Sequence, residues 1–395
     1  MSTILTATIV LLSVVLIVYH HAIYPLLLQW MGRRRKPDSP EPSPAIRDPD
    51  ADLPADLPSV TVIIPAYNEQ DFIADKIRNI GAMDYPPERL AVRLVCDGCS
   101  DRTADIARLT AMEPECRHLD FDIIGFAENR GKVAVLNDSV LQATTDIVVL
   151  SDVSALVSID AIQKLAQHFA DPRVGVVSSN YQLLNPGSSG EDVYWRYQRQ
   201  LKQNESVLGG LLGAHGAFYA FRRALFQVFE PDTINDDFIL PMRIIAQGYR
   251  GVYAPDVNAL ELECASDQLD THRRRRIAAG NLQQLLRLRE LLRPRYRGVA
   301  FAFASGKALR VLMPWLMLIA LLGSVYLAPE SWLFALLAAG QLFLYGLAAA
   351  THLAGETSAG KLRKALYYLV RGHASSLVGS IAYLFGCCRH GWQRG

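Results

Sequence analysis

The chain has 395 residues, 50% of them hydrophobic, and a formal net charge of +1 at pH 7. This balance argues against nucleic acid as the main partner, because nucleic-acid binding relies on an excess of positive charge. Apolar residues gather at the two ends of the chain, whereas residues 58–300 have the mixed composition of a soluble domain. The composition therefore indicates a soluble part attached to membrane segments.

The first segment, Ile4 to Leu28, is apolar and long enough to cross a bilayer as a helix. Four basic residues follow at 33–36, so the positive-inside rule predicts an external N-terminus and a cytoplasmic location for the chain that follows. A cleaved secretory signal is the competing interpretation, but no basic residue precedes the apolar run. We expect a transmembrane helix over residues 1–32 and, from its Pro-, Asp- and Ser-rich composition, an unfolded linker over 33–58.

The middle of the chain alternates short apolar runs with helical patterns. Strands are expected at 60–64, 91–96, 122–126, 147–150 and 175–178, and helices at 71–82, 103–112, 132–142 and 160–170. This alternation predicts an α/β domain over residues 59–281, with a mostly parallel sheet covered by helices on both faces. In such sheets, ligands bind beyond the carboxyl ends of the strands.

Residues 282–297 place leucines at helical spacing against arginines. The pattern is typical of an amphipathic helix at a membrane surface, and equally of a helix packed on the preceding domain. We expect interfacial helices over residues 282–306, which would bring the edge of the domain to the bilayer.

Two long apolar runs, Leu309 to Leu327 and Trp332 to Leu353, predict a helical hairpin in a C-terminal membrane region over residues 307–395. A last run, 365–385, contains Arg371, and an intramembrane cation is costly unless it faces protein or water. The sequence leaves open whether this run crosses the membrane, so the region holds two to three helices.

Polar motifs follow four of the predicted strands, at the point where each strand ends. They are Pro65-Ala-Tyr-Asn-Glu69, Cys96-Asp-Gly-Cys-Ser-Asp101, Asn129-Arg-Gly-Lys132 and Ser151-Asp152. Because the carboxyl ends of parallel strands meet at one edge of a sheet, we expect these groups to converge. An Asp in this position is also a common helix cap, and Asp101 suits that role equally well.

The expected chemistry at this edge is the binding of a nucleoside diphosphate. Asp97, beside Gly98, can accept hydrogen bonds from a base or ribose. Lys132 opens a helix, where its ammonium group and the helix N-terminus both favour phosphate. Asp152 is a hard oxygen ligand suited to Mg²⁺ or Mn²⁺, which bind through one or two carboxylates and substrate phosphates.

In their order and at these strand ends, the four motifs resemble those of the membrane-integrated family 2 glycosyltransferases, over roughly residues 60–313. The stretch 96–101 is similar to the family's Asp-Asp-Gly-Ser-x-Asp, and 151–154 to its Asp-x-Asp metal motif. The resemblance implies a glycosyltransferase A-like fold and an inverting enzyme with a nucleotide-sugar donor and a Mg²⁺ or Mn²⁺ ion on Asp152. The donor-binding residues that it implies in these motifs are Pro65, Tyr67, Glu69, Asp97 and Lys132.

Two further stretches extend the resemblance. The run 213–223 looks like the family's Gly-rich segment near the acceptor, and Thr233-Ile-Asn-Asp-Asp237 resembles the motif whose Asp acts as base. An acceptor hydroxyl needs a carboxylate within hydrogen-bond reach to take its proton. Aligned with the family motif, Asp237 is the base, and Asp236 is the second candidate. The simpler alternative is that these acids cap the following helix. The acceptor-side residues implied in the first run are Gly213, His215 and Gly216.

The basic run Arg273-Arg-Arg-Arg-Ile277 aligns with the family's Gln-x-x-Arg-Trp motif. By this alignment, Arg274 and Arg276 are candidates to bind a diphosphate, because a guanidinium group can donate two hydrogen bonds to one phosphate. A solvated face or a patch that attracts anionic lipid headgroups is the alternative. Ile277 stands on the acceptor side in place of the family's Trp.

Two departures weaken the donor side of the resemblance. Cys96 replaces the first Asp of the Asp-Asp-Gly motif, and Ser154 replaces the second carboxylate of Asp-x-Asp. Asp152 is then the one sure metal ligand of the motif.

The resemblance implies extension of a polysaccharide or a lipid-linked glycan from a nucleotide-diphospho-sugar, expected to be UDP-linked. The expected location is a bacterial inner membrane with the catalytic domain in the cytoplasm, in contact with lipids and compatible with secretion or assembly partners. Single transfer to a lipid is the alternative that the few membrane helices favour. An inactive membrane scaffold that retains the fold is the alternative of another class.

Overall fold

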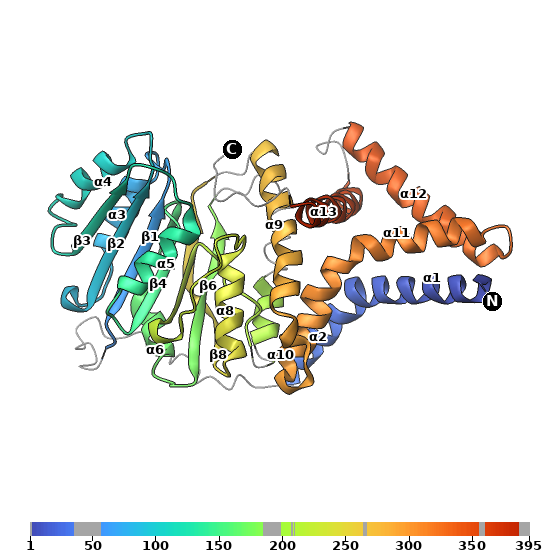
Figure 1. Ribbon diagram of the computed structural model, residues 1–395, viewed down its shortest axis with the longest axis horizontal. Coiled ribbons are helices and arrows are strands. Elements are labelled where there is room, and N and C mark those ends of the chain that lie inside the picture. Colours follow the sequence, from blue (N-terminus) through green and yellow to red (C-terminus); the bar gives the residue numbers. More distant parts are fainter. Residues whose placement is uncertain are drawn as a thin grey trace.

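The computed structural model describes residues 2–34, 57–184, 199–206, 208, 210–263, 267–354 and 360–386. A sheet flanked by helices forms one end of the molecule, and long helices from both ends of the chain form the other (Figure 1). The helix α9, Asp267–Arg287, stands between the two parts. The soluble part predicted for the middle of the chain is therefore joined to the apolar helices through α9.

The sheet has eight strands in the order β3-β2-β1-β4-β7-β6-β8-β5. Their bounds are β1 Val60–Ala66, β2 Leu90–Asp97, β3 Asp120–Phe126, β4 Ile147–Ser151, β5 Ala155–Val157, β6 Val174–Leu183, β7 Phe218–Arg222 and β8 Arg250–Glu261. The strands β1 to β4 run parallel, whereas β7 is antiparallel to β4 and β6. The α/β prediction is confirmed, with a mixed sheet whose parallel half carries all four motifs.

Helices cover both faces of the sheet. They are α3 Ile73–Gly81, α4 Thr103–Ala111, α5 Lys132–Gln142, α6 Ala161–His168 and α8 Asp236–Ala246. Every residue of β1 is buried, and its side chains alternate between two cores. Val62 and Ile64 pack with α3 and α6, whereas Ile63 packs with α5 and α8. Each fully buried aliphatic side chain of this kind contributes about 1.5–3 kcal/mol, which fixes the register of the strand.

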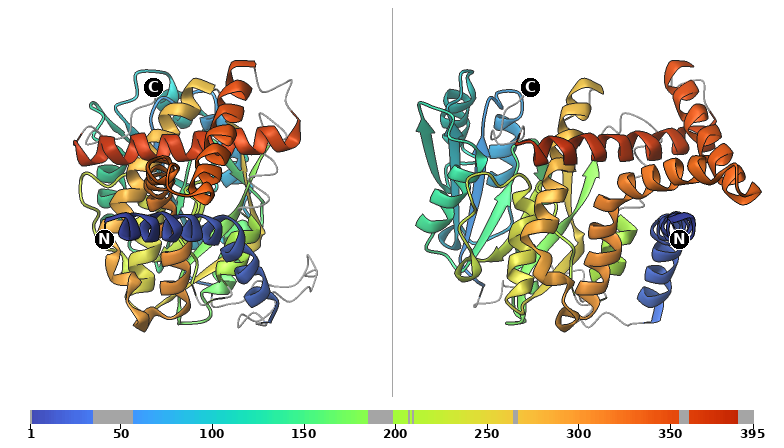
Figure 2. Two further views of the ribbon diagram at one scale, coloured as in Figure 1. Left: turned by 90° about the vertical axis from the view of Figure 1, so that its right-hand side faces the viewer. Right: turned by 45° about the vertical axis from the view of Figure 1, so that its right-hand side comes forward.

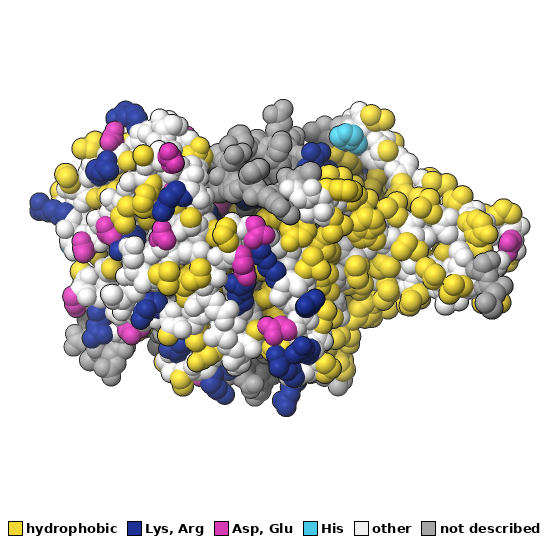
Figure 3. All heavy atoms as spheres, viewed as in Figure 1, with side chains coloured by type: hydrophobic (Ala, Val, Ile, Leu, Met, Phe, Trp, Pro, Cys, Tyr) yellow, Lys and Arg dark blue, Asp and Glu magenta, His cyan; other side chains and the backbone are white. Residues whose placement is uncertain are grey.

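The other end of the molecule consists of long apolar helices. Their bounds are α1 Ser2–Val18, α2 Tyr24–Arg34, α10 Gly298–Ala302, α11 Leu309–Leu327, α12 Trp332–Ala354 and α13 Lys361–Leu384. Within the described residues, three stretches are long and apolar enough to cross a membrane: Thr3–Arg33, Gly298–Leu327 and Trp332–Ala354. They correspond to the N-terminal segment and the hairpin expected from the sequence. Figure 3 shows apolar side chains covering this end, while charged groups lie over the sheet domain.

The final helix α13 contains the run 365–385 whose placement the sequence left open. It packs against α9, α11 and α12. In the right-hand view of Figure 2 it runs horizontally, whereas α1 is seen end-on. Close contact with α9 is possible because Gly379 has no side chain, and a Cβ there would lie 2.6 Å from the carbonyl oxygen of Arg275.

The helix α9 continues past residue 281, where the sequence suggested a boundary between the domain and separate interfacial helices. Its C-terminal part and the short turns that follow direct leucines toward the domain. Leu288 and Leu291 are buried in the core that also contains residues of α5 and α8. For these leucines the structure therefore agrees with the alternative of a helix packed on the domain.

Gly98, in the loop after β2, allows a close crossing of two motif loops. Its φ is +67°, and a Cβ at this position would lie 2.3 Å from the backbone nitrogen of Asn129. Its own N–H donates to the carbonyl oxygen of Phe126. The loop that leads to Lys132 therefore rests on the backbone of Gly98, and no other residue fits there without displacing it.

We expect Gly98→Ala to lower the thermal unfolding midpoint of the full chain. A left-handed conformation costs an L-residue about 1–2 kcal/mol, and the backbone contact adds to this cost. The matched control is Gly125→Ala on β3, where the nearest atom to a new Cβ is a guanidinium nitrogen of Arg108 at 3.7 Å. Equal unfolding midpoints for the two variants would contradict this description of the crossing.

Candidate functional site

The motif loops after β1 and β2 are tied together by hydrogen bonds. The side-chain oxygen of Asn68 accepts from the N–H of Ser100 at 2.8 Å, and the N–H of Glu69 donates to Oγ1 of Thr103 at 2.8 Å. Asp101 accepts from the N–H of Thr103 at 3.0 Å. Asp101 thus holds the first residue of α4, and its Oδ2 also accepts from the N–H of Gln70 in the first motif loop at 3.1 Å. Of the predicted donor-binding residues in that loop, Pro65 is buried in β1, Tyr67 is partly exposed and Glu69 is buried.

Asp97 lies inside the domain and organises the loop that leads to Lys132. Its side chain is 0% exposed, and Oδ2 accepts from the N–H groups of Arg130 and Gly131 at 3.0 and 2.8 Å. The neighbouring Cys96 is buried in the apolar core. Asp97 is therefore a positioning residue for the loop that leads to Lys132, while its buried Oδ1 has no hydrogen-bond partner among the described residues. Its predicted contact with the nucleoside stays a prediction.

Lys132, the first residue of α5, reaches two carboxylates from other elements. Its Nζ lies 3.0 Å from Oδ1 of Asp152 and 3.8 Å from Oδ2 of Asp236. Burial by itself would lower the pKa of Lys132, but Asp152 and Asp236 outweigh it and raise that pKa. Lys132 is therefore a permanent cation at the edge of the sheet.

Gly216 lies next to two carboxylates, and we call the space beside its Cα, where a side chain is missing, the gap. A Cβ at this position would lie 3.3 Å from Oδ2 of Asp237 and 3.6 Å from Oδ2 of Asp152. The Gly-rich segment is held here by its backbone, since the N–H of Ala214 donates to the carbonyl oxygen of Asp237 at 2.9 Å. The ring of His215 stacks on the ring of Tyr181, with 3.6 Å between the two ring centroids. Asp152, Asp237 and Gly216, predicted from three separate motifs, thus meet at one place.

The two adjacent acids at the start of α8 have different surroundings. Asp236 is buried, and its Oδ2 has no hydrogen-bond partner among the described residues. Asp237 is partly exposed and faces the gap at Gly216. Burial and the charge of Asp236 raise the pKa of Asp237 to about 6, against the opposing effect of Lys132 and Lys202. No side-chain hydrogen bond caps α8 at Asn235, so the geometry favours Asp237 as the group that a substrate can reach.

The helix α9 approaches the acids through Gly280. A Cβ on Gly280 would lie 2.3 Å from Nδ2 of Asn235, which donates to the carbonyl oxygen of Ile277 at 3.5 Å. The side chains of Ile277 and Arg276 are exposed. No ion pair joins Arg276 to the acids within the described residues, and the side chain of Arg274 lies outside them. The structure therefore brings the backbone of this motif to the site and leaves the side chain of Arg276 exposed.

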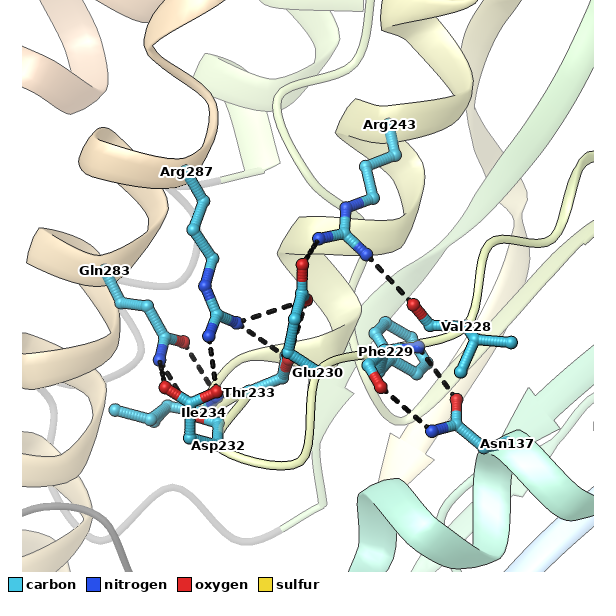
Figure 4. A network of polar contacts seen from close by, with 10 residues as sticks. All are labelled: Asn137, Val228, Phe229, Glu230, Asp232, Thr233, Ile234, Arg243, Gln283 and Arg287. Carbon is cyan, nitrogen blue, oxygen red and sulfur yellow. Dashed lines mark hydrogen bonds and ion pairs between the residues drawn. The ribbon is translucent and has the colours of Figure 1, made fainter.

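A polar network that the sequence did not predict fixes the loop before Asp236 (Figure 4). Arg287 on α9 donates to Oγ1 of Thr233 at 2.8 Å and to Oδ1 of Asp232 at 2.6 Å. Gln283 accepts from the N–H of Ile234 at 3.0 Å. From the opposite side, Asn137 of α5 forms two hydrogen bonds with the backbone of Phe229. Arg287, in the stretch for which the sequence left a membrane surface and packing on the domain equally open, binds an acidic loop.

Two lysines near the acids were also missed. Lys202 lies near Asp237 and Glu205, and burial lowers its pKa despite both carboxylates. Lys76 of α3 is 0% exposed, and its Nζ donates to Oγ of Ser151 at 2.6 Å and to the carbonyl oxygen of Ala155. It thereby holds both sides of the turn that carries Asp152. An isolated lysine in a helical pattern carries no sequence signal for such a role, because most lysines are solvated.

The acids fit a divalent cation as carboxylate ligands. No group of three or more His, Cys, Asp or Glu side chains in the described part of the chain has the arrangement of a complete metal site. However, oxygens of Asp152 and Asp237 face one gap, and a buried oxygen of Asp236 lacks a hydrogen-bond partner. Mg²⁺ and Mn²⁺ suit such a set, because they take one or two carboxylates and fill the remaining positions with phosphate and water.

Several known proteins are similar to this chain in sequence. Residues 58–280 match the family described as "Glycosyltransferase like family 2". The poly-beta-1,6-N-acetyl-D-glucosamine synthase of Staphylococcus aureus is 28% identical over 208 residues, which are 51% of this chain and 49% of the relative. An N-acetylglucosaminyltransferase of Rhizobium meliloti is 29% identical over 217 residues, 51% of this chain and 50% of the relative. The chain thus spans about half the length of the curated relatives it matches.

A solved structure resembles nearly the whole chain. It is a mannosyltransferase from Pyrobaculum calidifontis in complex with GDP-Man and Mn²⁺, with a TM-score of 0.71 and 25% identity over 96% of this chain and 99% of that one. The family match covers more than half of the chain, including the four motif loops and the acids. This chain therefore belongs to the family 2 glycosyltransferases.

Proposed function

We propose that the protein is an inverting glycosyltransferase that uses a nucleotide-diphospho-sugar to extend a polysaccharide or a lipid-linked glycan at the cytoplasmic face of the membrane. The observation that carries the proposal is the gap at Gly216, which is bordered by Asp152 and Asp237 next to Lys132. A base and a group that neutralises the leaving diphosphate are the two requirements of a direct displacement.

Asp237 is the proposed base. As the acceptor oxygen forms its bond to the anomeric carbon, Asp237 takes the hydroxyl proton. The bond between that carbon and the phosphate oxygen breaks, and its electron pair leaves with the nucleoside diphosphate. A single displacement from the opposite side inverts the anomeric centre. With a pKa of about 6, Asp237 is mostly ionised at neutral pH and still close enough to that pH to accept a proton effectively.

Lys132 and Asp152 form the proposed diphosphate side. The Lys132 ammonium group and the N-terminus of α5 both favour phosphate. A Mg²⁺ or Mn²⁺ ion held by Asp152 would neutralise charge on the leaving diphosphate when bound. The similar mannosyltransferase was solved with GDP-Man and Mn²⁺, which supports a metal-dependent nucleotide site and makes a GDP-linked donor the second candidate beside a UDP-linked one. Tyr67, Glu69, Arg274 and Arg276 are further donor-side candidates.

The acceptor side is proposed around Gly213, His215, Gly216 and Ile277. The names of the two curated relatives favour a chain of N-acetylglucosamine units as product. Single transfer to a lipid remains the alternative, because three candidate membrane spans among the described residues form a small membrane region. Incubation of the purified full chain with UDP-GlcNAc, UDP-glucose and GDP-mannose, each with Mn²⁺, tests the proposal by the release of nucleoside diphosphate. Product length on a gel separates the two alternatives, and no release with any donor would favour the scaffold.

Asp237→Asn should reduce sugar transfer about 10²–10⁴-fold, because the amide cannot take the acceptor proton. The matched control is Asp105→Asn on α4, whose carboxylate pairs with Arg108 on an exposed face. Initial rates of nucleoside diphosphate release at saturating donor and acceptor provide the measurement. An Asp237→Asn enzyme with the wild-type rate would refute the assignment of the base.

The transfer rate should fall with decreasing pH, with a midpoint of about 6, because protonation of Asp237 removes the base. Lys202 lowers the pKa of Asp237, so Lys202→Met should move this midpoint to higher pH. Lys164→Met serves as control, since its ammonium group pairs with Asp160 on α6. The measurement is the pH dependence of kcat for the wild type, Lys202→Met and Lys164→Met. If Lys202→Met has the same pH midpoint as the wild type, Lys202 does not influence the pKa of Asp237, and this prediction is wrong.

Removal of divalent cations by a chelator should abolish transfer, and Mn²⁺ or Mg²⁺ should restore it. Asp152→Asn should require a higher metal concentration for half-maximal activity, because the amide is a weaker ligand than the carboxylate. Titration of activity with Mn²⁺ is the measurement, with Asp105→Asn again as control. Full activity of the metal-free wild type would exclude a metal requirement.

A further inference from the structure

The end of β2 and the loop after it contain two cysteines, in the order Cys96-Asp-Gly-Cys99, and both thiols are free. Cys96 is buried in the apolar core, whereas Cys99 is partly exposed and packs against that core. A buried cysteine commonly serves as a small apolar side chain, and this explanation is sufficient for Cys96. It leaves the partly exposed Cys99 unexplained.

The sheet brings the two thiols together. Ala66 of β1 is the register partner of Cys96 of β2, and neighbouring strands lie about 4.8 Å apart. The thiol of Cys99 donates to the carbonyl oxygen of Ala66 at 3.5 Å. Because Gly98 has a φ of +67°, the chain turns after the strand and returns Cys99 to this position. The two thiols are hydrogen-bonded to each other.

This hydrogen bond gives the two thiols different reactivity. Donation from the Cys96 thiol lowers the pKa of Cys99 to about 7, against the opposing effect of burial. The same hydrogen bond, together with burial, raises the pKa of Cys96. The thiolate is the nucleophilic form of cysteine, and a lowered pKa of one thiol is a known property of Cys-x-x-Cys pairs. Cys99 is therefore the reactive thiol, and Cys96 is its neighbour in reserve.

Cys116 has the surroundings of a structural cysteine and is a reference for the pair. It is 0% exposed, and its thiol donates to the carbonyl oxygen of Ile77 at 3.8 Å. Burial raises its pKa, so that it stays a thiol at neutral pH. The contrast with Cys99 shows that a position in this core does not by itself make a cysteine reactive.

The segment between the two cysteines supports the loop that leads to Lys132. Asp97 accepts from the N–H groups of Arg130 and Gly131, and the backbone of Gly98 is in contact with Asn129. A disulfide requires its two sulfur atoms to be about 2.0 Å apart, closer than in a hydrogen bond. Formation of this bond would tighten residues 96–99 and disturb the support of the loop.

We infer that Cys99 is a site of reversible oxidation that forms a disulfide with Cys96, and that this disulfide loosens the loop before Lys132 and slows transfer. The inference goes beyond the proposed function, because it adds a modification site to the donor side of the domain. In the proposed cytoplasmic location thiols are kept reduced, and disulfides that form there are usually transient and catalytic or redox-sensing.

The oxidant is a peroxide. The Cys99 thiolate attacks one oxygen of hydrogen peroxide, the O–O bond breaks, and Cys99 becomes a sulfenic acid as hydroxide leaves. The Cys96 sulfur then attacks the sulfenic sulfur, the S–O bond breaks, and a second hydroxide leaves as the disulfide forms. The protons of the two original thiols convert both hydroxide ions to water. Two electrons thus pass from the thiols to the peroxide.

The chemical test treats the purified full chain in detergent with hydrogen peroxide, alkylates the remaining thiols and analyses the proteolytic peptide with residues 96–99 by mass spectrometry. The wild-type peptide should resist alkylation and be two hydrogen masses lighter than the reduced peptide, and dithiothreitol should restore both thiols. In Cys96→Ser, Cys99 should stop at the sulfenic acid, which dimedone traps. In Cys99→Ser, Cys96 should stay a thiol. Wild-type protein in which both thiols remain open to alkylation would overturn the inference.

The effect on the loop is measured on the same samples by hydrogen–deuterium exchange. Oxidation should speed exchange at the N–H groups of Arg130 and Gly131, and dithiothreitol should reverse this change. Cys99→Ser should show no such change, whereas the matched control Cys116→Ser should respond like the wild type. Equal exchange before and after disulfide formation would overturn the proposed effect on the loop.

The effect on transfer is measured by the release of nucleoside diphosphate from the sugar donors. Peroxide should lower the rate of the wild type and of Cys116→Ser, with recovery in dithiothreitol, and should leave Cys99→Ser at its own untreated rate. An equal loss in Cys99→Ser would overturn the assignment of the effect to the pair. If the reduced wild type releases nothing from any donor, the proposed function fails, while the peptide mass and the exchange still decide the inference.

Discussion

The site depends on one ion-pair cluster, in which the ammonium group of Lys132 lies 3.0 Å from Asp152 and 3.8 Å from Asp236. These carboxylates belong to the turn after β4 and the start of α8, and Asp237 adds a third acid beside them. Like charges do not gather in a poorly solvated place without a compensating cation. Lys132 supplies that cation, and the remaining negative charge is suited to a divalent metal ion.

Two parts of the fold position the site. One holds the loop before Lys132, and the other, α9, holds the loop before Asp236. Buried Asp97 holds the backbone of the loop before Lys132, and this loop rests on Gly98. On the opposite side, α9 fixes the acidic loop before Asp236 through Gln283 and Arg287. Since α9 also packs against α13, the segment that positions the proposed base is in contact with the C-terminal helices.

The parallel half of the sheet and the meeting of its motif loops could be predicted from the sequence, because hydrophobic runs and strand polarity are local properties. Gly216 and Asp237 were assigned to the site by the family resemblance, and the structure places them beside Asp152. The inward orientation of Asp97 was not predictable, since a carboxylate after a strand gives the same pattern whether it faces a ligand or a loop. The choice between a membrane surface and the domain for Arg287 could not be made from the sequence, because its acidic partners are more than fifty residues away. Lys202 gave no pattern in the sequence, and only tertiary packing brings it to Asp237.

The central claim is that one diphosphate binds between Lys132 and Asp152 with its sugar toward Asp237. A structure of the full chain with Mn²⁺ and a non-hydrolysable nucleotide-sugar analogue measures this directly. The account predicts that the diphosphate contacts Nζ of Lys132, that the metal ion is bound by Asp152, and that the anomeric carbon lies at the gap beside Gly216. A nucleotide bound with its phosphates away from Lys132 and Asp152, and its sugar outside that gap, would contradict it.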